Sequence, residues 1–242
     1  GRCNIFRGSF YFLLEVKVSG YLLYNKSKQT TVSLKESAMS SVQIVPMENK
    51  HLDQAARVIS KSFQTEEFAK NTFDFSDPET EVLFAELLKI ELEVFIKHIE
   101  KINIALYDGN VAGVTTVKIS DDKHGFSHFK KVLKRIRKVV PVAKRVQYKK
   151  LFRLYSAMKQ PKSIPKEAIS LEILAVSPDY QGKGIGKAML NALDEYSESI
   201  SRPIYLYTSN AENVTYYEKV GFKTVDTIQK KDFTAFHMLK VL

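Results

Sequence analysis

The stretch from Ser170 to Tyr196 constrains the fold of this chain most, because a strand, a glycine-rich turn and a helix follow one another there without a gap. The strand is the apolar run Leu171–Val176, which ends at Ser177-Pro178 because proline supplies no backbone donor to a sheet. The turn Gln181–Lys187 contains three glycines and leads directly into a helical pattern. This succession predicts an α/β domain built around the segment.

The glycine-rich turn is suited to holding an anion. Glycine allows a backbone at positive φ and lets a ligand approach without a Cβ in the way. The first N–H groups of a helix lack internal acceptors and lie at the positive end of the helix dipole, which favours phosphate or pyrophosphate. Lys183 and Lys187 add positive charge to the turn. We therefore predict a phosphate-bearing ligand at this position.

The spacing of the glycines decides between phosphate-binding motifs. The Walker A pattern fails, because Gln181 stands where it needs glycine and Ala188 where it needs Ser or Thr. The dinucleotide pattern Gly-x-Gly-x-x-Gly lacks its last glycine in either register. The turn does fit Gln-x-x-Gly-x-Gly, with Gln181, Gly184 and Gly186. Preceded by Leu-Ala-Val-Ser-Pro, it closely resembles the acyl-CoA-binding motif of the GNAT superfamily of N-acetyltransferases.

A second segment, Asn210–Phe222, supports this resemblance. In the GNAT superfamily a later motif opens a helix with Asn, carries a Tyr and ends in Gly-Phe. Asn210, Tyr217 and Gly221 stand at the matching places here. The two motifs occur in the family's order, at a separation that fits one helix and one strand. The alternative is a glycine turn and a glycine C-cap in another kind of α/β protein, since a motif match is a hypothesis.

The resemblance implies a mixed, mostly antiparallel central sheet flanked by helices. The first half is expected to contain a strand at 42–46, a helix over 52–63, a long helix from 79 to about 100, and a hairpin of 102–107 and 111–119 around Asp108-Gly109. The second half is expected to contain the central strand 169–176, a helix from 184 to about 199, a strand at 203–208, a helix over 210–220, and last strands at 222–227 and 233–241.

The net charge of +10 belongs to one segment. Between Lys118 and Lys166, many Lys and Arg stand against only two acidic residues. In the GNAT superfamily the hairpin leads quickly to the central strand, whereas residues 121–167 intervene here as a basic helical insertion, expected as two helices broken at Pro141. Its charge suits a solvated face, a wall of the acceptor pocket, an acidic substrate, nucleic acid or anionic lipid. No nucleic-acid-binding motif accompanies it, so we do not expect nucleic acid as the partner.

Residues 1–40 are expected to be an N-terminal extension of an acetyltransferase domain that spans 41–242. Met39 lies just before the first strand, so we expect it to be the natural start of the chain and the residues before it not to be native. The alternative is a targeting peptide, suggested by Arg2 and Arg7.

The composition indicates in which cellular compartment the protein is expected. Cys3 is the single cysteine, so no disulfide framework can form within the chain, and a reducing, cytoplasmic location is expected. No uncharged apolar run approaches the ~18 residues of a membrane span, so no segment is expected to cross a membrane.

The resemblance implies acetyl-CoA as a cosubstrate and no metal. Backbone groups of the turn would hold the pyrophosphate, and the central strand would pair with the pantetheine amides as an added strand would. The cofactor-binding residues expected on this basis are Leu174, Ala175, Val176, Gln181, Gly182, Lys183, Gly184, Ile185, Gly186, Lys187, Asn210 and Tyr217.

Acetyl transfer to an amine needs a base, because an amine of pKa ~10.4 arrives protonated and is not nucleophilic. Glu172 is the predicted base, since many GNAT relatives have an acidic residue acting as base on this strand. Strand alternation places Glu172 on one face with Leu174 and Val176. The same alternation places Leu171 on the other face. The alternative role for Glu172 is an ion pair with the basic insertion.

The departing thiolate benefits from a proton donor, since a thiol has a pKa of ~8.5. Tyr217 matches the family's Tyr and is the predicted acid. The alternative is a hydrogen bond that only positions the sulfur. Tyr216 points about 100° away around the helix and is expected to pack in the core.

These observations predict an acetyl-CoA-dependent N-acetyltransferase that moves the acetyl group directly to an amine acceptor, either a small molecule or a peptide. Cys3 lies outside the domain, so no covalent intermediate on cysteine is expected. The alternative is a non-catalytic acyl-CoA-binding or regulatory domain whose basic insertion contacts nucleic acid or a partner.

Overall fold

The computed structural model describes residues 5–6, 42–64, 66, 69, 73–98, 101–119, 153, 156–231 and 233–241; for residues 5–6 and 94–98 it describes the backbone alone. Its strands are β1 Ile5–Phe6, β2 Gln43–Pro46, β3 Lys101–Tyr107, β4 Asn110–Ile119, β5 Ile169–Val176, β6 Ile204–Thr208, β7 Lys223–Gln229 and β8 Thr234–Lys240. Its helices are η1 Asn49–His51, α2 Leu52–Phe63, α4 Pro78–His98, η2 Pro178–Tyr180, α8 Ile185–Ser199 and α9 Ala211–Lys219. Each helix and strand expected within the described residues is present.

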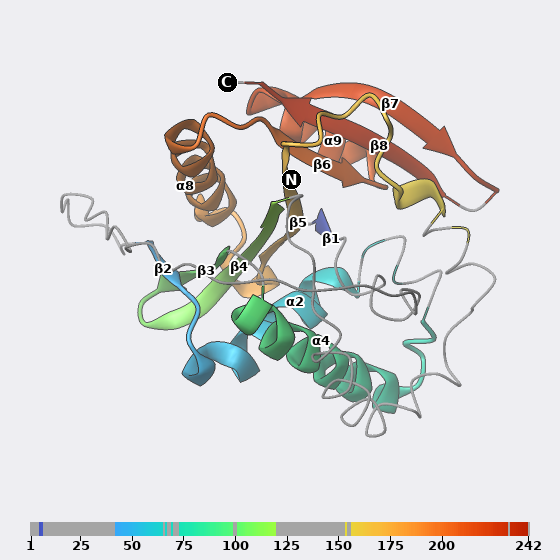
Figure 1. The fold of residues 1–242 in the computed structure, drawn as a ribbon. Helices are drawn as coiled ribbons and strands as arrows, with labels where there is room; N and C mark the ends of the chain where they lie inside the picture. Colours follow the sequence, from blue (N-terminus) through green and yellow to red (C-terminus); the bar gives the residue numbers. More distant parts are fainter. Residues whose placement is uncertain are drawn as a thin grey trace.

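A mixed sheet forms the centre of the molecule (Figure 1). Its strands lie in the order β2-β3-β4-β5-β6-β8-β7, and β1 adds a further pairing to β5. The neighbours are antiparallel except β5 and β6, which are parallel. The expected fold class, a mostly antiparallel sheet flanked by helices, is therefore confirmed.

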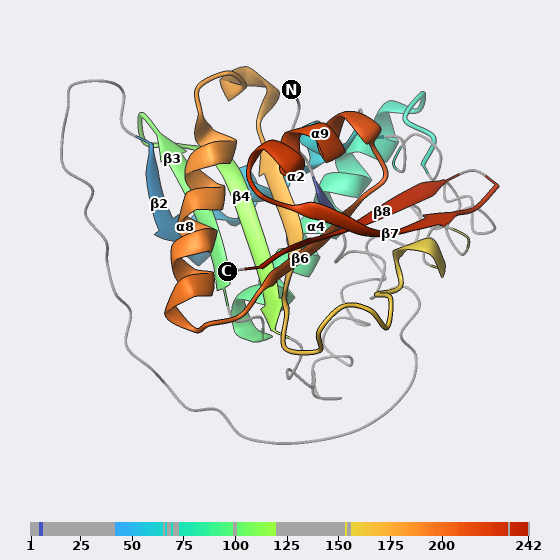
Figure 2. The same ribbon diagram turned by 90° about the horizontal axis from the view of Figure 1, so that it is seen from above.

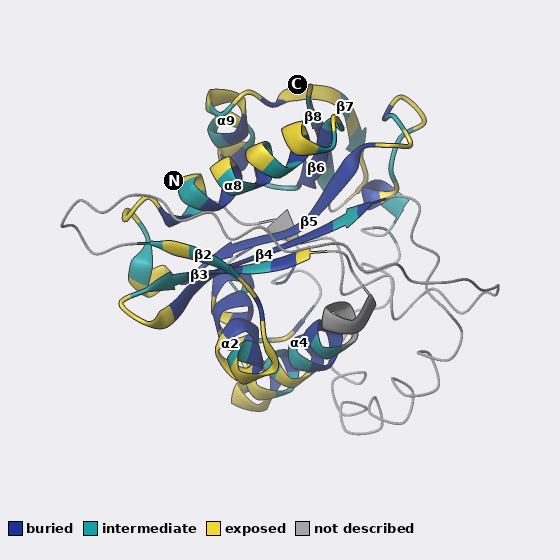
Figure 3. Ribbon diagram, turned by 60° about the vertical axis from the view of Figure 1, so that its left-hand side comes forward, coloured by how far each residue is buried: buried dark blue, intermediate teal, exposed yellow. Residues whose placement is uncertain are grey.

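Helices cover both faces of the sheet (Figure 3). On one face α2 and α4 form a buried core with side chains such as Ile104, Val114 and Ile173. On the other face α8 and α9 form a second core with side chains such as Leu174 and Leu206. Seen from above, α8 lies across the β2–β4 side of the sheet and α9 lies beside β6–β8 (Figure 2).

The local sequence explains the main turns. The hairpin between β3 and β4 turns at Asp108 and Gly109, with φ values of 50° and 77°, as a type I′ turn requires. Helix α9 ends in a Schellman motif. The N–H of Phe222 donates to the carbonyl of Tyr217 over 3.0 Å, and Gly221 takes the left-handed position at φ 96°.

The parallel join between β5 and β6 is short. Only Ile169 with Ile204 and Ser170 with Tyr205 are in register. Beyond Ser170 the two strands separate, so β6 does not pair with the facing edge of β5 over residues 171–176. The fold thereby creates a slot at the centre of the sheet.

Most of the basic insertion lies outside the described residues, including the expected break at Pro141. Its last part, residues 156–167, is described and packs against the sheet. Ala157 and Met158 join the core under α2 and α4, and Ile164 packs with Tyr205. The buried His237 connects this part of the insertion to β6. Its Nδ1 lies 2.6 Å from the Tyr205 hydroxyl, and its Nε2 lies 3.0 Å from the Ala157 carbonyl oxygen.

The expected N-terminal extension also lies largely outside the described residues. Its described part, Ile5–Phe6, pairs with β5. No helix in the described part of the chain is long and apolar enough to cross a membrane.

Candidate functional site

The glycine-rich turn lies at the carboxyl end of β5, after η2. Ser177 caps η2, because its Oγ accepts a hydrogen bond from the N–H of Asp179 over 3.4 Å. Gly182 and Gly184 take the left-handed conformation, at φ 80° and 76°. A Cβ at either glycine would meet no atom of the described residues within 4 Å. With respect to the described residues, the backbone of the turn is therefore accessible to a ligand.

The N-terminus of α8 has no side-chain cap. Gly184 is the N-cap residue, and the N–H of Ala188 donates to its carbonyl over 3.0 Å. The N–H groups of residues 185–187 thus precede the first backbone hydrogen bond of the helix. The first turn of α8 contains no acidic residue. These donors and the positive end of the helix dipole favour an anion here.

Lys183 is held beside the turn by two aromatic rings. Its Nζ lies 4.3 Å from the ring centroid of Tyr107 and 5.6 Å from that of Tyr180. The two ring centroids are 5.5 Å apart. The contact keeps a positive charge at the turn. This pair of rings could not be predicted from the sequence, because Tyr107 belongs to the end of β3, far away in the chain.

Asn210, the second motif's first residue, lies at the same edge of the sheet. Strands β5 and β6 are parallel, so the residues that follow their carboxyl ends meet at one edge. The Asn210 Oδ1 accepts a hydrogen bond from the N–H of Glu212 over 2.9 Å and so caps α9. Its backbone N–H donates to Thr208 Oγ1 over 3.2 Å. Its role in cofactor binding stays a prediction.

Replacing Asn210 by Ala removes this cap and is expected to lower the free energy of unfolding by about 1 kcal/mol. Asn210→Ser keeps a capping oxygen and should lose far less. Urea unfolding followed by circular dichroism measures both variants. Equal stability of the Ala variant and the wild type would show that the cap contributes nothing.

Glu172 is the extra residue of a β-bulge. Along β4, Val117 pairs with Leu171 and the next residue, Thr116, pairs with Ile173, so the register skips Glu172. The side chain of Glu172 is buried at 4% exposure. The alternation expected for this strand was wrong at Leu171, which packs with Leu174 in the core beneath α8. The bulge is the reason, because an extra residue shifts the alternation on one side of it.

Tyr217 is fully buried in the core between α9 and the sheet. Its ring makes edge contacts with Phe222 and Tyr216, at centroid distances of 5.6 and 5.4 Å. Tyr216 is only half-buried against the same core. Tyr216, which was expected to pack in the core, is thus more exposed than Tyr217. The roles of Glu172 and Tyr217 stay predictions.

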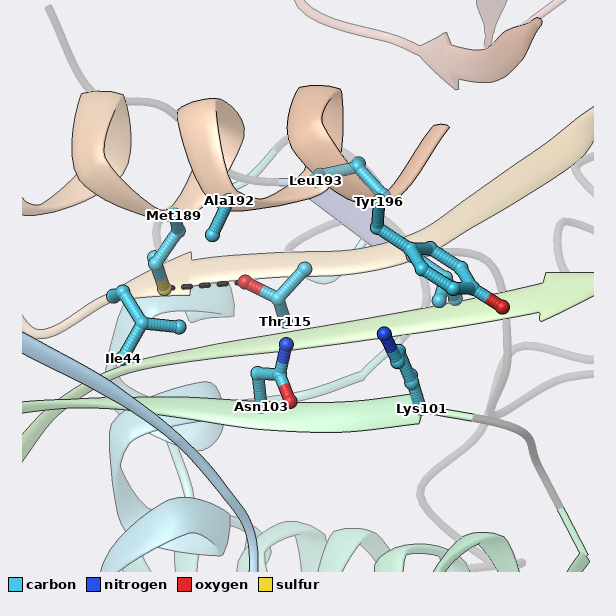
Figure 4. A pocket seen from close by; sticks show the side chains of 9 residues that line it. Ile44, Lys101, Asn103, Thr115, Met189, Ala192, Leu193 and Tyr196 are labelled. Carbon is cyan, nitrogen blue, oxygen red and sulfur yellow. Dashed lines mark hydrogen bonds between the residues drawn. The ribbon is translucent and has the colours of Figure 1, made fainter. Parts of the chain in front are cut away.

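A small pocket lies under the middle of α8, away from these residues (Figure 4). Its lining includes Thr115, whose Oγ1 is 3.1 Å from Met189 Sδ, and Tyr196. The Lys101 Nζ lies 3.5 Å from the centroid of the Tyr196 ring, and partial burial lowers the pKa of Lys101. None of the predicted site residues lines this pocket. In the described residues, no group of three or more His, Cys, Asp or Glu side chains is placed to hold a metal ion.

Comparison with known proteins gives one match to a family model. Residues 154–224, which include the turn and the whole second motif, match the family model described as an acetyltransferase (GNAT) domain. Over this segment the chain matches the GNAT acetyltransferases. The matched segment runs from the end of the insertion to the start of β7, so it holds β5, α8, β6 and α9 together.

Solved structures share the fold of this GNAT domain. One is the Corynebacterium glutamicum protein described as histone acetyltransferase HPA2 and related acetyltransferase, at a TM-score of 0.61 and 17% identity over 83% of this chain and 96% of that one. Another is arylalkylamine N-acetyltransferase 2 from Aedes aegypti, at 0.52 and 16% identity over 83% and 98%. A third is the PaiA N-acetyltransferase of Thermoplasma acidophilum in complex with coenzyme A, at 0.51 and 18% identity over 84% and 99%.

Proposed function

We propose that this protein is an N-acetyltransferase that transfers an acetyl group from acetyl-CoA directly to an amine acceptor. The observation that carries the proposal is the open, left-handed turn Gln181–Lys187, which leads into the uncapped N-terminus of α8. The turn lies within the segment that matches the GNAT domain. A solved structure of the same fold contains coenzyme A, which supports the choice of ligand.

The residues present fit acetyl-CoA at two places. The backbone of the turn is open to solvent and carries positive charge at Lys183 and Lys187, which suits a pyrophosphate. Strands β5 and β6 separate after Ser170. The backbone of β5 beyond this residue could therefore pair with the amides of a pantetheine arm. Leu174 to Val176 would supply that backbone. When bound, acetyl-CoA supplies the acetyl thioester and leaves as the thiol.

Glu172 is proposed to accept the proton of the amine. Its position supports this role in two ways. It lies in the strand that borders the slot, and bulges of this kind occur preferentially next to active sites. A carboxylate that takes the proton, directly or through a water molecule, leaves the amine nitrogen with a free electron pair for the acetyl carbon.

Tyr217 is proposed to donate a proton to the departing sulfur. Replacing Tyr217 by Phe keeps the ring contacts with Phe222 and Tyr216 and removes only the hydroxyl. Turnover is expected to fall by about 10²-fold or more, while the dissociation constant for acetyl-CoA changes little. Tyr216→Phe is the matched control and should retain the wild-type rate. Unchanged turnover in the Tyr217 variant would remove the acid assignment.

The proposal as a whole is tested by titration and turnover. Calorimetric titration with acetyl-CoA and with CoA should show saturable binding at one site. A panel of small amines and of peptides with free N-termini should then release CoA thiol in proportion to acetylated product. Binding without transfer to any amine would favour a non-catalytic acyl-CoA-binding domain. No binding would remove the function proposed here.

A further inference from the structure

The slot between β5 and β6 holds a segment of the chain itself. In antiparallel register, Ile5 pairs with Leu174 and Phe6 pairs with Ile173. The other edge of β5 is already taken at these positions, because Thr115 pairs with Leu174 and Thr116 pairs with Ile173. Strand β1 therefore lies on the edge that faces β6, as Figure 1 shows, and it also contacts β6.

This edge is the one that the proposed function assigns to the pantetheine arm. A strand has two edges, and each backbone group along an edge can serve one partner at a time. With β4 on one side and β1 on the other, Ile173 and Leu174 have no edge left for a ligand. Acyl-CoA and β1 thus need the same backbone of β5.

We propose that the Ile5–Phe6 segment is an internal competitor for the acyl-CoA site, so that its release from β5 is required before acyl-CoA can bind fully. This inference rests on the proposed function and on Ile5 and Phe6 belonging to the natural chain, in contrast to the start at Met39 expected from the sequence. It adds a means of regulation to the same site. The glycine turn stays accessible while β1 is in place, since Gly182 and Gly184 face open space. The competition therefore acts on the pantetheine end of the ligand and not on the pyrophosphate end.

The size of the effect follows from the fraction of molecules in which β1 is docked. The apparent dissociation constant equals the intrinsic one divided by the fraction that is competent to bind. If β1 is docked in about nine molecules of ten, removing it tightens acetyl-CoA binding about ten-fold. A segment of two paired residues adds a small number of backbone contacts, so a modest effect of this size is expected rather than complete blockage.

The test uses the full chain with Ile5→Pro and Phe6→Pro together. Proline removes the backbone N–H that pairing requires, so β1 cannot form whichever of the two residues donates to β5. The matched control, Ile5→Val with Phe6→Tyr, keeps both N–H groups and a high strand propensity. Calorimetric titration with acetyl-CoA should give about ten-fold tighter binding for the proline variant and wild-type affinity for the control.

A second readout does not depend on acyl transfer. A fluorescein-labelled peptide with the sequence of residues 1–10 should bind the proline variant, seen as a rise in anisotropy, and acetyl-CoA should displace it. Equal acetyl-CoA affinity in the wild type and the proline variant, with no displaceable peptide, would overturn the competition and leave the proposed function standing. Absence of acetyl-CoA binding in all three proteins would overturn both.

Discussion

Replacing Gly184 and Gly186 together by Asp is expected to weaken acetyl-CoA binding by more than about 100-fold. Hydrogen bonds to charged groups contribute roughly 1.5–3 kcal/mol each, so the loss of two such bonds to the pyrophosphate exceeds this factor. The new carboxylates also repel the ligand. The fold should persist, because Asp tolerates the left-handed conformation of Gly184 and favours the first turn of a helix.

The matched control for this pair is Asn at both positions. Asn has nearly the same size and tolerates the same backbone, but it carries no charge. Calorimetric titration of both variants distinguishes the effect of the added charge on acetyl-CoA binding from the effect of side-chain size. Circular dichroism checks that both variants remain folded. Binding that survives in the Asp variant would place the pyrophosphate elsewhere on the protein.

Replacing Glu172 by Gln is expected to lower kcat/KM by about 10²- to 10⁴-fold at neutral pH, which is the usual contribution of a general base. Gln has the same shape and stays in the bulge, but it does not accept the proton. The loss should shrink as the pH rises toward ~10.4, because a growing share of the amine then arrives unprotonated. The acetyl-CoA dissociation constant should change little.

Glu167→Gln is the matched control, since Glu167 is exposed and lies just before the same strand. Its pH–rate profile should follow that of the wild type. A Glu172 variant whose rate loss is the same at every pH would contradict a role in proton removal and would favour a structural role.

The helices and strands could be predicted because each depends on local signals. The Asp108-Gly109 turn and the Gly221 C-cap both need a positive φ, and the sequence supplies residues that adopt it. The glycine spacing of the turn before α8 was sufficient to predict an open backbone there. These features are set by residues adjacent in the chain, which is why they are visible without a structure.

The parts that could not be predicted depend on pairing between distant residues. The bulge at Glu172 is a relation between β4 and β5, so alternation within one strand could not reveal it and misplaced Leu171. The ring platform under Lys183 joins residues from β3 and η2. The pairing of Ile5 with Leu174 joins opposite parts of the chain, and neither residue carries a local signal for it.

The short parallel join between β5 and β6 has a mechanical consequence. Among the described strands, two register pairs join β5 to β6, and the N–H of Ile169 also donates to the carbonyl of Pro203 over 2.8 Å. The two halves are otherwise held by side chains, such as Leu206 and Met238 packed with Leu190, and by the ion pair of Lys240 with Asp194 at 2.8 Å. Few backbone hydrogen bonds therefore join the two parts of the sheet, and side-chain packing contributes most of the contact between them. We therefore expect changes in the size of these core side chains to alter the separation of β5 and β6.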